Sequence, residues 1–285
     1  MFSESSAEVQ EALVSGFVIF MMVSVGLDLT TDKLKSVFKA PRVLMAALGI
    51  NYVIVPLVFL ALITWTGLEG MWATGLLFVA VAPGGPVAVV LVQNARGHLA
   101  LGVSLLILMN LLNTVATPIG IWALDVMPTT SDGSSPVWGM IKTIVLVQLL
   151  PLGAAMFFRA RWTPLAVSLQ PGVEKASKIL LLVVAIAVVA SETQRIGSVP
   201  IALLIVCHVA VVVSLLVGWW LTPGSWEDKV AVSLSTPYRS ISVVLLLLTA
   251  WVKNADAFIA AMLYSGTMLW MCLAASTWIR RRRGP

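Results

Sequence analysis

Two short stretches of the chain combine helix-breaking residues with groups that could bind a ligand. The first reads Pro83-Gly84-Gly85-Pro86, and the second reads Ser235-Thr236-Pro237-Tyr238-Arg239-Ser240. Proline lacks a backbone donor and clashes with the preceding turn, whereas glycine adopts conformations that other residues avoid. Each stretch therefore predicts an interrupted helix whose backbone N–H and C=O groups are free for binding.

The two half-helices at such a break differ in charge. The half that follows presents free N–H groups, which suit an anion, and the half that precedes presents carbonyls, which suit a cation. Arg239 could also bind a carboxylate, sulfonate or phosphate through two parallel hydrogen bonds. The alternatives are a break that only bends the helix and an arginine that only satisfies free carbonyls. We expect the substrate-binding residues to be Pro83, Gly84, Gly85, Pro86, Asn113, Pro237, Arg239 and Ser240.

A pair of amides, Asn110 and Asn113, lies one helical turn apart on one face of an apolar run. In a membrane, such amides bond between helices more often than they line a site. Contact of Asn113 or Thr114 with substrate is the alternative.

Other side chains with reactive or polar groups have less specific surroundings. His208 could relay a proton, because histidine titrates near neutral pH, or it could bond to a neighbouring helix. Tyr264 and Trp270 could border a cavity or simply pack. Cys207 and Cys272 lie in apolar runs and have no metal or redox spacing, so they read as small hydrophobic residues.

The composition defines the solvent of this protein. Of the 285 residues, 59% are hydrophobic and 11% are charged, and the mean hydropathy is +0.99. Soluble domains are about 45–50% apolar and about 25% charged. A chain of this size cannot bury so much apolar surface in water. These values predict an integral membrane protein and exclude a soluble enzyme, a nucleic-acid binder and a secreted disulfide scaffold.

Nine apolar runs are long enough, or nearly so, to cross a bilayer of about 30 Å as helices. The first run is not expected to be a cleaved signal peptide, because acids and no Lys or Arg precede it. The sixth run is short. We place the runs at Val9–Leu27, Val43–Trp65, Met71–Gln93, Leu99–Asp125, Val137–Phe158, Ile179–Ala190, Val199–Leu221, Val230–Trp251 and Ala257–Ile279.

The loop cations predict the orientation. One set of loops is almost free of them, with Arg195, Lys253 and, near a membrane end, Lys142. The positive-inside rule makes the other, cation-rich side cytoplasmic, with the N-terminus outside and the C-terminus inside, in a cell or inner membrane. The four arginines Arg280–Arg283 are interpreted as a topology anchor after the last run or, alternatively, as a lipid-binding or localisation motif. The cation-rich set is Lys33, Lys35, Lys39, Arg42, Arg96, Arg159, Arg161, Lys175, Lys178, Lys229 and Arg280–Arg283.

Both predicted breaks fall near mid-membrane, in the third and the eighth run. Unwound backbone at this depth must be buried in protein or line a wet cavity. The third and the eighth run are five membrane crossings apart, which is an odd number, so they cross the membrane in opposite directions. This arrangement fits an inverted repeat of about five helices. Interrupted helices in corresponding halves are typical of secondary transporters. The longest polar connections are expected at Met127–Pro136 and Arg159–Lys175.

Several motifs resemble the bile acid:sodium symporter superfamily. They are Val23-Ser24-Val25-Gly26-Leu27-Asp28-Leu29-Thr30 before a basic loop, Val81-Ala82-Pro83-Gly84-Gly85-Pro86, Ala95-Arg96-Gly97-His98-Leu99-Ala100-Leu101 and Thr117-Pro118. The resemblance implies an all-α membrane fold with two crossing broken helices. It also implies a panel domain, residues 9–29 and 137–190, and a core domain, residues 43–126 and 199–279.

The resemblance further implies two sodium sites, but this chain lacks most of their ligand types. The family's threonine and serine–asparagine pair after the first break are replaced by Pro86, Ala88 and Val89. The hydroxyls of the next helix are replaced by Gly102 and Leu106. In the second broken helix, a glutamate and a glutamine–asparagine pair are replaced by Ser235, Arg239 and Ser240. The amide of the second run is kept, as Asn51.

We therefore expect Arg239 to act as a built-in cation in place of sodium. None of the 13 acidic residues falls at mid-membrane in these runs, and an arginine at that depth must face the interior. The remnant of the ion sites is then Asn51, Ser235, Thr236 and Arg239.

The predicted function is sodium-independent secondary transport of small organic anions by alternating access, with no cofactor. A sodium-coupled symporter that uses Ser235, Thr236 and Ser240 is the first alternative. A ligand sensor is another, and so is a membrane-embedded enzyme, although no intramembrane nucleophile or metal cluster is visible. No P-loop pattern for ATP occurs. The expected partners are the substrate and the lipid bilayer, not nucleic acid, and the sequence does not specify an oligomeric state.

Overall fold

The computed structural model describes residues 4–28, 41–126, 136–191 and 197–282. All named elements in these ranges are helices. They are α1 (Glu4–Asp28), α3 (Pro41–Gly49), η2 (Ile50–Ile54), α4 (Val55–Thr66), α5 (Gly70–Ala80), α6 (Val87–Asn94), α7 (Leu99–Ala123), α8 (Val137–Ile144), η3 (Val145–Leu149), α9 (Leu150–Arg161), α10 (Thr163–Ser191), α12 (Ile201–Trp220), α13 (Trp226–Ser235), α14 (Ile241–Leu247), η4 (Leu248–Val252) and α15 (Ala255–Arg282).

Within the described residues, six helices or continuous helix pairs are long and apolar enough to cross a membrane. Two shorter apolar helices, Gly70–Ala80 and Ile241–Val252, belong to the interrupted elements. The nine predicted runs all fall on these helices or on α6, α10 and α13. The chain is therefore an integral membrane protein. The six spans are Glu11–Asp28, Pro41–Thr66, Leu99–Ala123, Val137–Arg161, Ile201–Trp220 and Ala255–Arg282.

The predicted polar connection Arg159–Lys175 is wrong in extent. Helix α9 ends at Arg161, and α10 begins at Thr163, so the helix that carries the sixth run starts well before Ile179. The side chain of Glu174 binds Lys178 at 2.6 Å, four residues further on. Such pairs stabilise a helix, so polar residues extend α10 instead of forming a loop. The cations Lys33, Lys35, Lys39 and Arg195, and residues 127–135 of the outer connection, lie outside the described residues.

In the part of the chain that the structure describes, three helical turns are widened to π-helix. Two of them, η2 and η3, immediately precede a helical segment with proline in its first turn, Pro56 and Pro151. A proline ring clashes with the carbonyl four residues earlier and offers no N–H. The wider turn relieves this clash and lets the long helix continue. The third turn, η4, closes α14.

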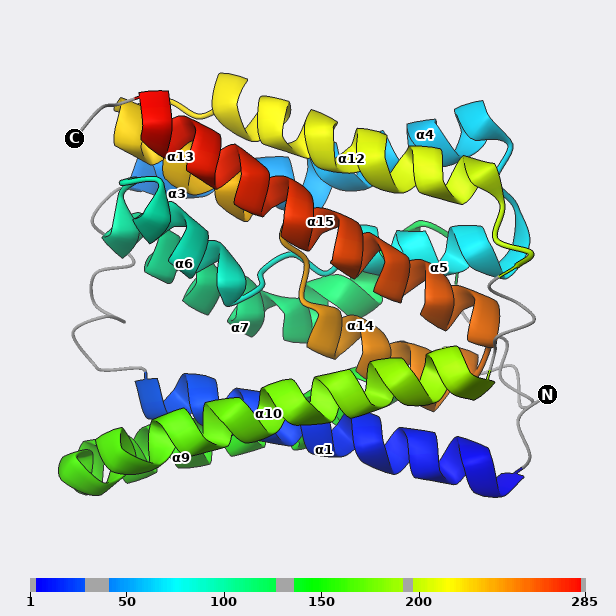
Figure 1. Cartoon of the computed structure of the whole chain (residues 1–285), viewed down its shortest axis with the longest axis horizontal. Coiled ribbons are helices and arrows are strands. Elements are labelled where there is room, and N and C mark those ends of the chain that lie inside the picture. The colour runs from blue at the N-terminus through cyan, green and yellow to red at the C-terminus, as the bar shows by residue number, and fades with distance from the viewer. Residues whose placement is uncertain (1–3, 29–40, 127–135, 192–196, 283–285) are drawn as a thin grey trace.

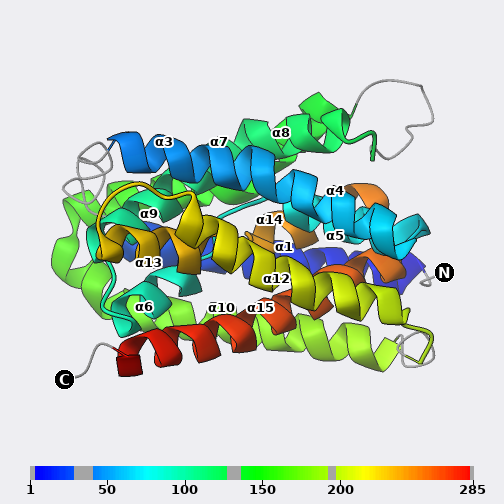
Figure 2. The ribbon, with the colours of Figure 1, turned by 90° about the horizontal axis from the view of Figure 1, so that it is seen from above.

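The helices form a layered bundle along one long axis. Helix α1 packs against α9 and α10, and Figure 1 shows these three elements together along one edge of the molecule. Helix α15 packs against α5 and α12, and α12 packs against α4. Figure 2, seen from above, shows α12 beside α4.

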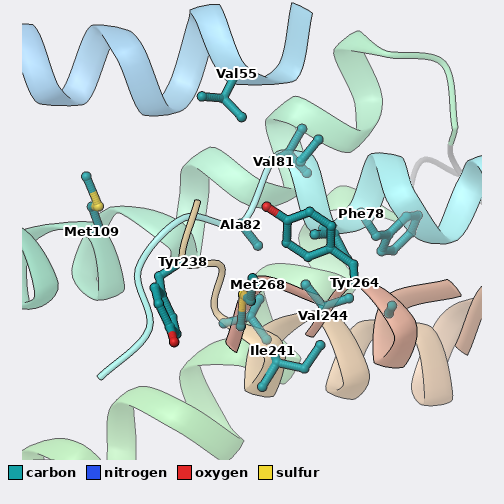
Figure 3. Close-up of a cluster of buried hydrophobic side chains, with 14 of the residues drawn as sticks. Val55, Phe78, Val81, Ala82, Met109, Tyr238, Ile241, Val244, Tyr264 and Met268 are labelled. Carbon is teal, nitrogen blue, oxygen red and sulfur yellow. The ribbon is translucent and has the colours of Figure 1, made fainter. Parts of the chain in front are cut away.

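The interrupted helices lie at the centre of this bundle. All side chains of residues 75–85 are buried, as are all those of residues 230–248. Figure 3 shows the apolar side chains packed around the two breaks. Unwound backbone at membrane depth is stable where protein surrounds it, and these two segments meet that condition.

Candidate functional site

Two unwound segments meet side by side in the bundle. Residues 81–86 separate α5 from α6, and residues 236–240 separate α13 from α14. Pro83 and Arg239 form an antiparallel bridge between them. The two predicted breaks thus face each other, although more than 150 residues separate them in the chain.

Backbone hydrogen bonds join the segments. The N–H of Gly84 donates to the carbonyl of Tyr238 at 3.0 Å, and the N–H of Ser240 donates to the carbonyl of Ala82 at 2.7 Å. Gly84 has φ +99°, and a Cβ there would lie 2.9 Å from the Cβ of Met109. Only glycine meets both conditions, because L side chains avoid this region of φ.

Side chains from α7 and η2 satisfy the carbonyls of the first break. The amide of Asn113 donates to the carbonyl of Pro83 at 2.6 Å, and the hydroxyl of Tyr52 donates to the Asn113 Oδ1 at 2.7 Å. Thr117 donates to the carbonyl of Val81 at 3.1 Å. The polar atoms of Asn113 are thus used within the protein.

The second break has a comparable brace. Tyr264 is fully buried, and its hydroxyl donates to the carbonyl of Pro237 at 2.9 Å. It lines neither of the cavities described below. Figure 3 shows that the hydroxyls of Tyr238 and Tyr264 point in opposite directions.

Arg239 is almost completely buried, with 1% of its surface exposed. Nη1 donates to the carbonyls of Asn51 and Ala80 at 3.3 and 3.2 Å, and Nη2 donates to the carbonyl of Thr236 at 2.8 Å. Ala80 ends α5 and Thr236 caps α13, so the guanidinium lies at the negative ends of two half-helices. No carboxylate forms an ion pair with it in the described ranges.

A very small cavity of about 10 Å³ lies beside the breaks. It has room for roughly one water molecule. The hydroxyl of Ser235 is buried and has no partner among the described residues. Four of the lining residues occupy positions where the family resemblance implied sodium ligands, namely Ala88, Gly102, Leu106 and Ser235. The lining is Gly84, Gly85, Ala88, Gly102, Leu105, Leu106, Met109 and Ser235.

A larger cavity of about 210 Å³ shares Leu106 with the small one and lies between α1, α7 and α9. Asn110 carries the one polar side chain among the described residues that line it, and its amide donates to the carbonyl of Leu106 at 2.8 Å. The cavity could accept the apolar part of a ligand beside the breaks. The lining is Met22, Val25, Leu106, Ile107, Asn110, Leu111, Leu152 and Met156.

Several sequence candidates lie away from the cavities. His208 is exposed, packs against Trp270 with ring centroids 5.8 Å apart, and donates from Nδ1 to the carbonyl of Leu204 at 2.7 Å. It bonds within its own helix, so the expected bond to a neighbouring helix is wrong. The side chain of Asn51 donates to the carbonyl of Ala47, and its backbone carbonyl accepts a hydrogen bond from Arg239.

Two polar residues near the site were not predicted. Tyr52 holds Asn113, and Gln148 is fully buried in η3. Both are polar side chains within apolar runs, and this contrast could have identified them from the sequence. No group of three or more His, Cys, Asp or Glu side chains that could hold a metal occurs in the described part of the chain.

A side-chain hydrogen bond joins the ends of the two interrupted helices that lie away from the breaks. Nδ1 of His98, which follows α6, lies 2.7 Å from Oδ1 of Asp228 in the first turn of α13. Ser225 and Asp228 also form a reciprocal helix cap. Partial burial acts to raise the pKa of Asp228, but the bonds from His98 and Ser225 outweigh it and hold the pKa below its ordinary value.

Comparison with known proteins identifies the family. A sequence model of the Sodium Bile acid symporter family matches residues 16–199, more than half of the chain. The chain belongs to this family. The resemblance expected from the motifs around the first break is thereby confirmed.

Individual relatives in the Sodium Bile acid symporter family are distant. The probable sodium/metabolite cotransporter BASS1, chloroplastic, of Arabidopsis thaliana is 27% identical over 150 residues, 53% of this chain and 36% of that protein. The uncharacterized sodium-dependent transporter YocS of Bacillus subtilis is 30% identical over 145 residues, 50% of this chain and 44% of YocS. The probable sodium/metabolite cotransporter BASS2, chloroplastic, of Oryza sativa subsp. japonica is 25% identical over 206 residues, 71% of this chain and 48% of that protein. Each alignment spans less than half of the relative's length.

Proposed function

We propose that the protein is a sodium-independent secondary transporter of small organic anions, in which Arg239 is a fixed cation. The observation that carries the proposal is the position of its guanidinium among the carbonyls of Asn51, Ala80 and Thr236. Backbone carbonyls at the ends of broken helices attract a cation. In this protein the guanidinium of Arg239, a cation that is part of the chain, already binds these carbonyls.

The family resemblance implies a second sodium site, at the small cavity beside Ser235, and this site offers few oxygen ligands. Sodium needs several oxygen ligands at close range, but Ala88, Gly102 and Leu106 supply no side-chain oxygen beside Ser235. The remaining space of about 10 Å³ accommodates little more than one water. Loss of both sites supports uniport or exchange over sodium symport.

The larger cavity suits an organic anion with an apolar portion. Its lining is mainly aliphatic, and the small cavity beside it reaches Ala88 in the first turn of α6. The N-terminal end of a helix carries a partial positive charge, which favours an anion. Arg239 adds positive charge nearby without lining either cavity.

A close contact at one end of the bundle, together with a cavity towards the other, supports alternating access. Gly139 at the start of α8 lies against the indole of Trp251 in η4, so closely that a Cβ would overlap the ring. Met156, which lines the large cavity, lies 17 residues further along the continuous helix formed by α8, η3 and α9. This spacing corresponds to roughly 25 Å at 1.5 Å per residue. In the proposed mechanism the bundle is closed at the Trp251 end and accessible at the other.

We place this motion between a panel, residues 9–29 and 137–190, and a core, residues 43–126 and 199–279, with nine membrane crossings in an inverted repeat. With the N-terminus outside and the C-terminus in the cytoplasm, Trp251 closes the outer side. The described conformation then faces inward, towards the cytoplasm.

Sodium-coupled symport is the second candidate. The names of the relatives, which describe sodium-dependent transporters or cotransporters, favour it. The hydroxyl of Ser235, which has no partner among the residues that the structure describes, also favours it. In this alternative, hydroxyls and carbonyls bind sodium without a carboxylate.

Exchange in proteoliposomes tests the carrier function. Purified protein is reconstituted with an internal pool of unlabelled carboxylates and sulfonates, and the entry of each labelled anion is measured. We expect exchange of at least one anion by the wild type and its loss in Arg239→Ala, with Arg161→Ala as a matched control that retains it. Absence of exchange for every anion would overturn the proposal and leave a ligand-binding sensor.

A further inference from the structure

Gln148 is a buried amide without a hydrogen-bond partner in the described part of the chain. None of its surface is exposed, and neither Oε1 nor Nε2 has a hydrogen-bond partner among the described residues. Burial of a polar group without a hydrogen bond costs free energy, so such groups in native proteins call for an explanation. An amide has one acceptor and two donor hydrogens, all of which are available here.

Its position relates it to the large cavity. Gln148 precedes Leu152 by one helical turn and Met156 by two, and both of these residues line the cavity. Residues at this spacing share one face of a helix. The turn η3 also packs against α1 and α7, the two other helices that line the cavity. The amide of Gln148 therefore lies one turn before Leu152, on the same helix face as the two lining residues but outside the lining itself.

Gln148 also lies in a π-helical turn, as do two other buried polar groups without a full set of partners. These are Oδ1 of Asn51 in η2 and Nε1 of Trp251 in η4. Asn51 contacts Arg239 through its carbonyl, and Trp251 packs against Gly139. Single π-turns inside α-helices occur frequently at functional sites. The turn around Gln148 precedes Pro151, which accounts for its wider geometry, and Gln148 is the one amide in these turns with both polar atoms unpaired among the described residues.

We propose that Gln148 binds the transported anion and requires a hydrogen-bond donor on it, so that the substrate carries a hydroxyl or amide beside its charged group. The proposal rests on the carrier function. Nε2 donates to an oxygen of the anion, and Oε1 accepts from the hydroxyl or amide N–H. A simple carboxylate offers only acceptors and leaves Oε1 unsatisfied, which penalises its binding.

A pair of acids that differ by one hydroxyl tests this proposal. Hexanoate and 2-hydroxyhexanoate are compared in proteoliposome exchange and in equilibrium binding to the purified protein. We expect the wild type to prefer 2-hydroxyhexanoate by about tenfold, the usual order for one buried hydrogen bond. In Gln148→Leu this preference disappears, while the melting temperature stays equal or rises because an unsatisfied amide is removed.

Ser214→Ala is the matched control. Ser214 is also buried, with a hydroxyl that has no partner among the described residues, but it lies on α12, which carries no lining residue of either cavity, whereas η3 continues directly into the cavity-lining helix α9. This variant should keep the preference for the hydroxy acid. A retained preference in Gln148→Leu, equal treatment of the two acids by the wild type, or a lowered melting temperature in Gln148→Leu would overturn the inference. Selective binding without exchange would instead support Gln148 as a ligand-binding residue and reject the carrier function.

Discussion

Nη1 of Arg239 donates to the carbonyl of Ala80 at 3.2 Å, across 159 positions of the chain. This bond ties the second break to the last residue of α5. The same guanidinium also binds the carbonyls of Asn51 and Thr236. The charge is therefore part of the fold as well as part of the proposed site.

Replacement of Arg239 by leucine should destabilise the protein strongly. The change leaves three carbonyls without donors, and each buried unsatisfied group costs about 1–3 kcal/mol. We expect the free energy of unfolding to fall by about 3 kcal/mol or more, measured by thermal and denaturant unfolding in detergent. Arg161→Leu, at the exposed end of α9, should stay within about 0.5 kcal/mol of the wild type. Equal stability of the two variants would contradict a structural role of the guanidinium.

Gly84→Ala tests the close pairing of the breaks. Alanine must adopt φ +99° and place its Cβ 2.9 Å from that of Met109. Overpacking alone costs about 1–3 kcal/mol, so we expect a loss of at least that size in the unfolding free energy. The control is Gly153→Ala, because a Cβ at this position in α9 meets nothing within 4 Å. Removing a glycine from a helix interior should stabilise the protein by about 0.5–1 kcal/mol. A neutral Gly84→Ala would show that the segments do not approach as described.

The hydrogen bond between His98 and the carboxylate of Asp228 predicts a pH dependence. The pKa of Asp228 is lower in the folded state than in the unfolded chain, because its carboxylate accepts bonds from His98 and Ser225. The folded state therefore binds the proton less readily, and the pair stabilises the protein above the unfolded pKa of about 3.9. This contribution is lost as the pH falls through the folded value.

Asp228→Asn should remove this part of the stability. The expected loss near neutral pH is about 1 kcal/mol, since the pair is partly exposed and salt screens it. Unfolding curves of the wild type and the variant should converge as the pH is lowered towards 3. A constant difference down to that pH would indicate that the carboxylate charge is not responsible.

The contact of Trp251 with Gly139 predicts a closed outer side. In a variant with Asn110→Cys, the thiol should react with an impermeant maleimide from the cytoplasmic side and only slowly from outside. Adding Trp251→Ala removes the ring that packs on Gly139 and should raise labelling from outside several-fold. Trp122→Ala, at an exposed position of α7, is the control and should leave labelling unchanged. Equal labelling with and without Trp251 would assign the seal to other residues.

Local chemistry explains what could be predicted from the sequence. Proline and glycine act on the backbone wherever they stand, so both breaks were evident from Pro83 to Pro86 and around Pro237. The apolar runs were equally evident, because lipid sets the helix length. The end of a polar segment is less defined, and the Glu174–Lys178 pair extends α10 through a predicted connection.

Long-range pairing could not be predicted in detail. Nothing in the sequence specifies that Gly84 bonds to Tyr238, or that Tyr52 holds Asn113, because these contacts depend on how α7 and η2 pack against the breaks. In the sequence, Gln148 is only one polar residue within an apolar run, and nothing else there marks it as a site. That neither atom of its amide has a partner among the described residues follows from the packing of the folded chain.

The central claim is that a guanidinium occupies the place of a mobile ion. Equilibrium binding of radioactive sodium to the purified wild-type protein, at constant ionic strength with potassium, tests it most directly. We predict no saturable sodium binding, because Arg239 already binds the carbonyls and Ala88, Gly102 and Leu106 offer no ligands. Saturable binding that unlabelled sodium displaces and potassium does not would contradict the claim.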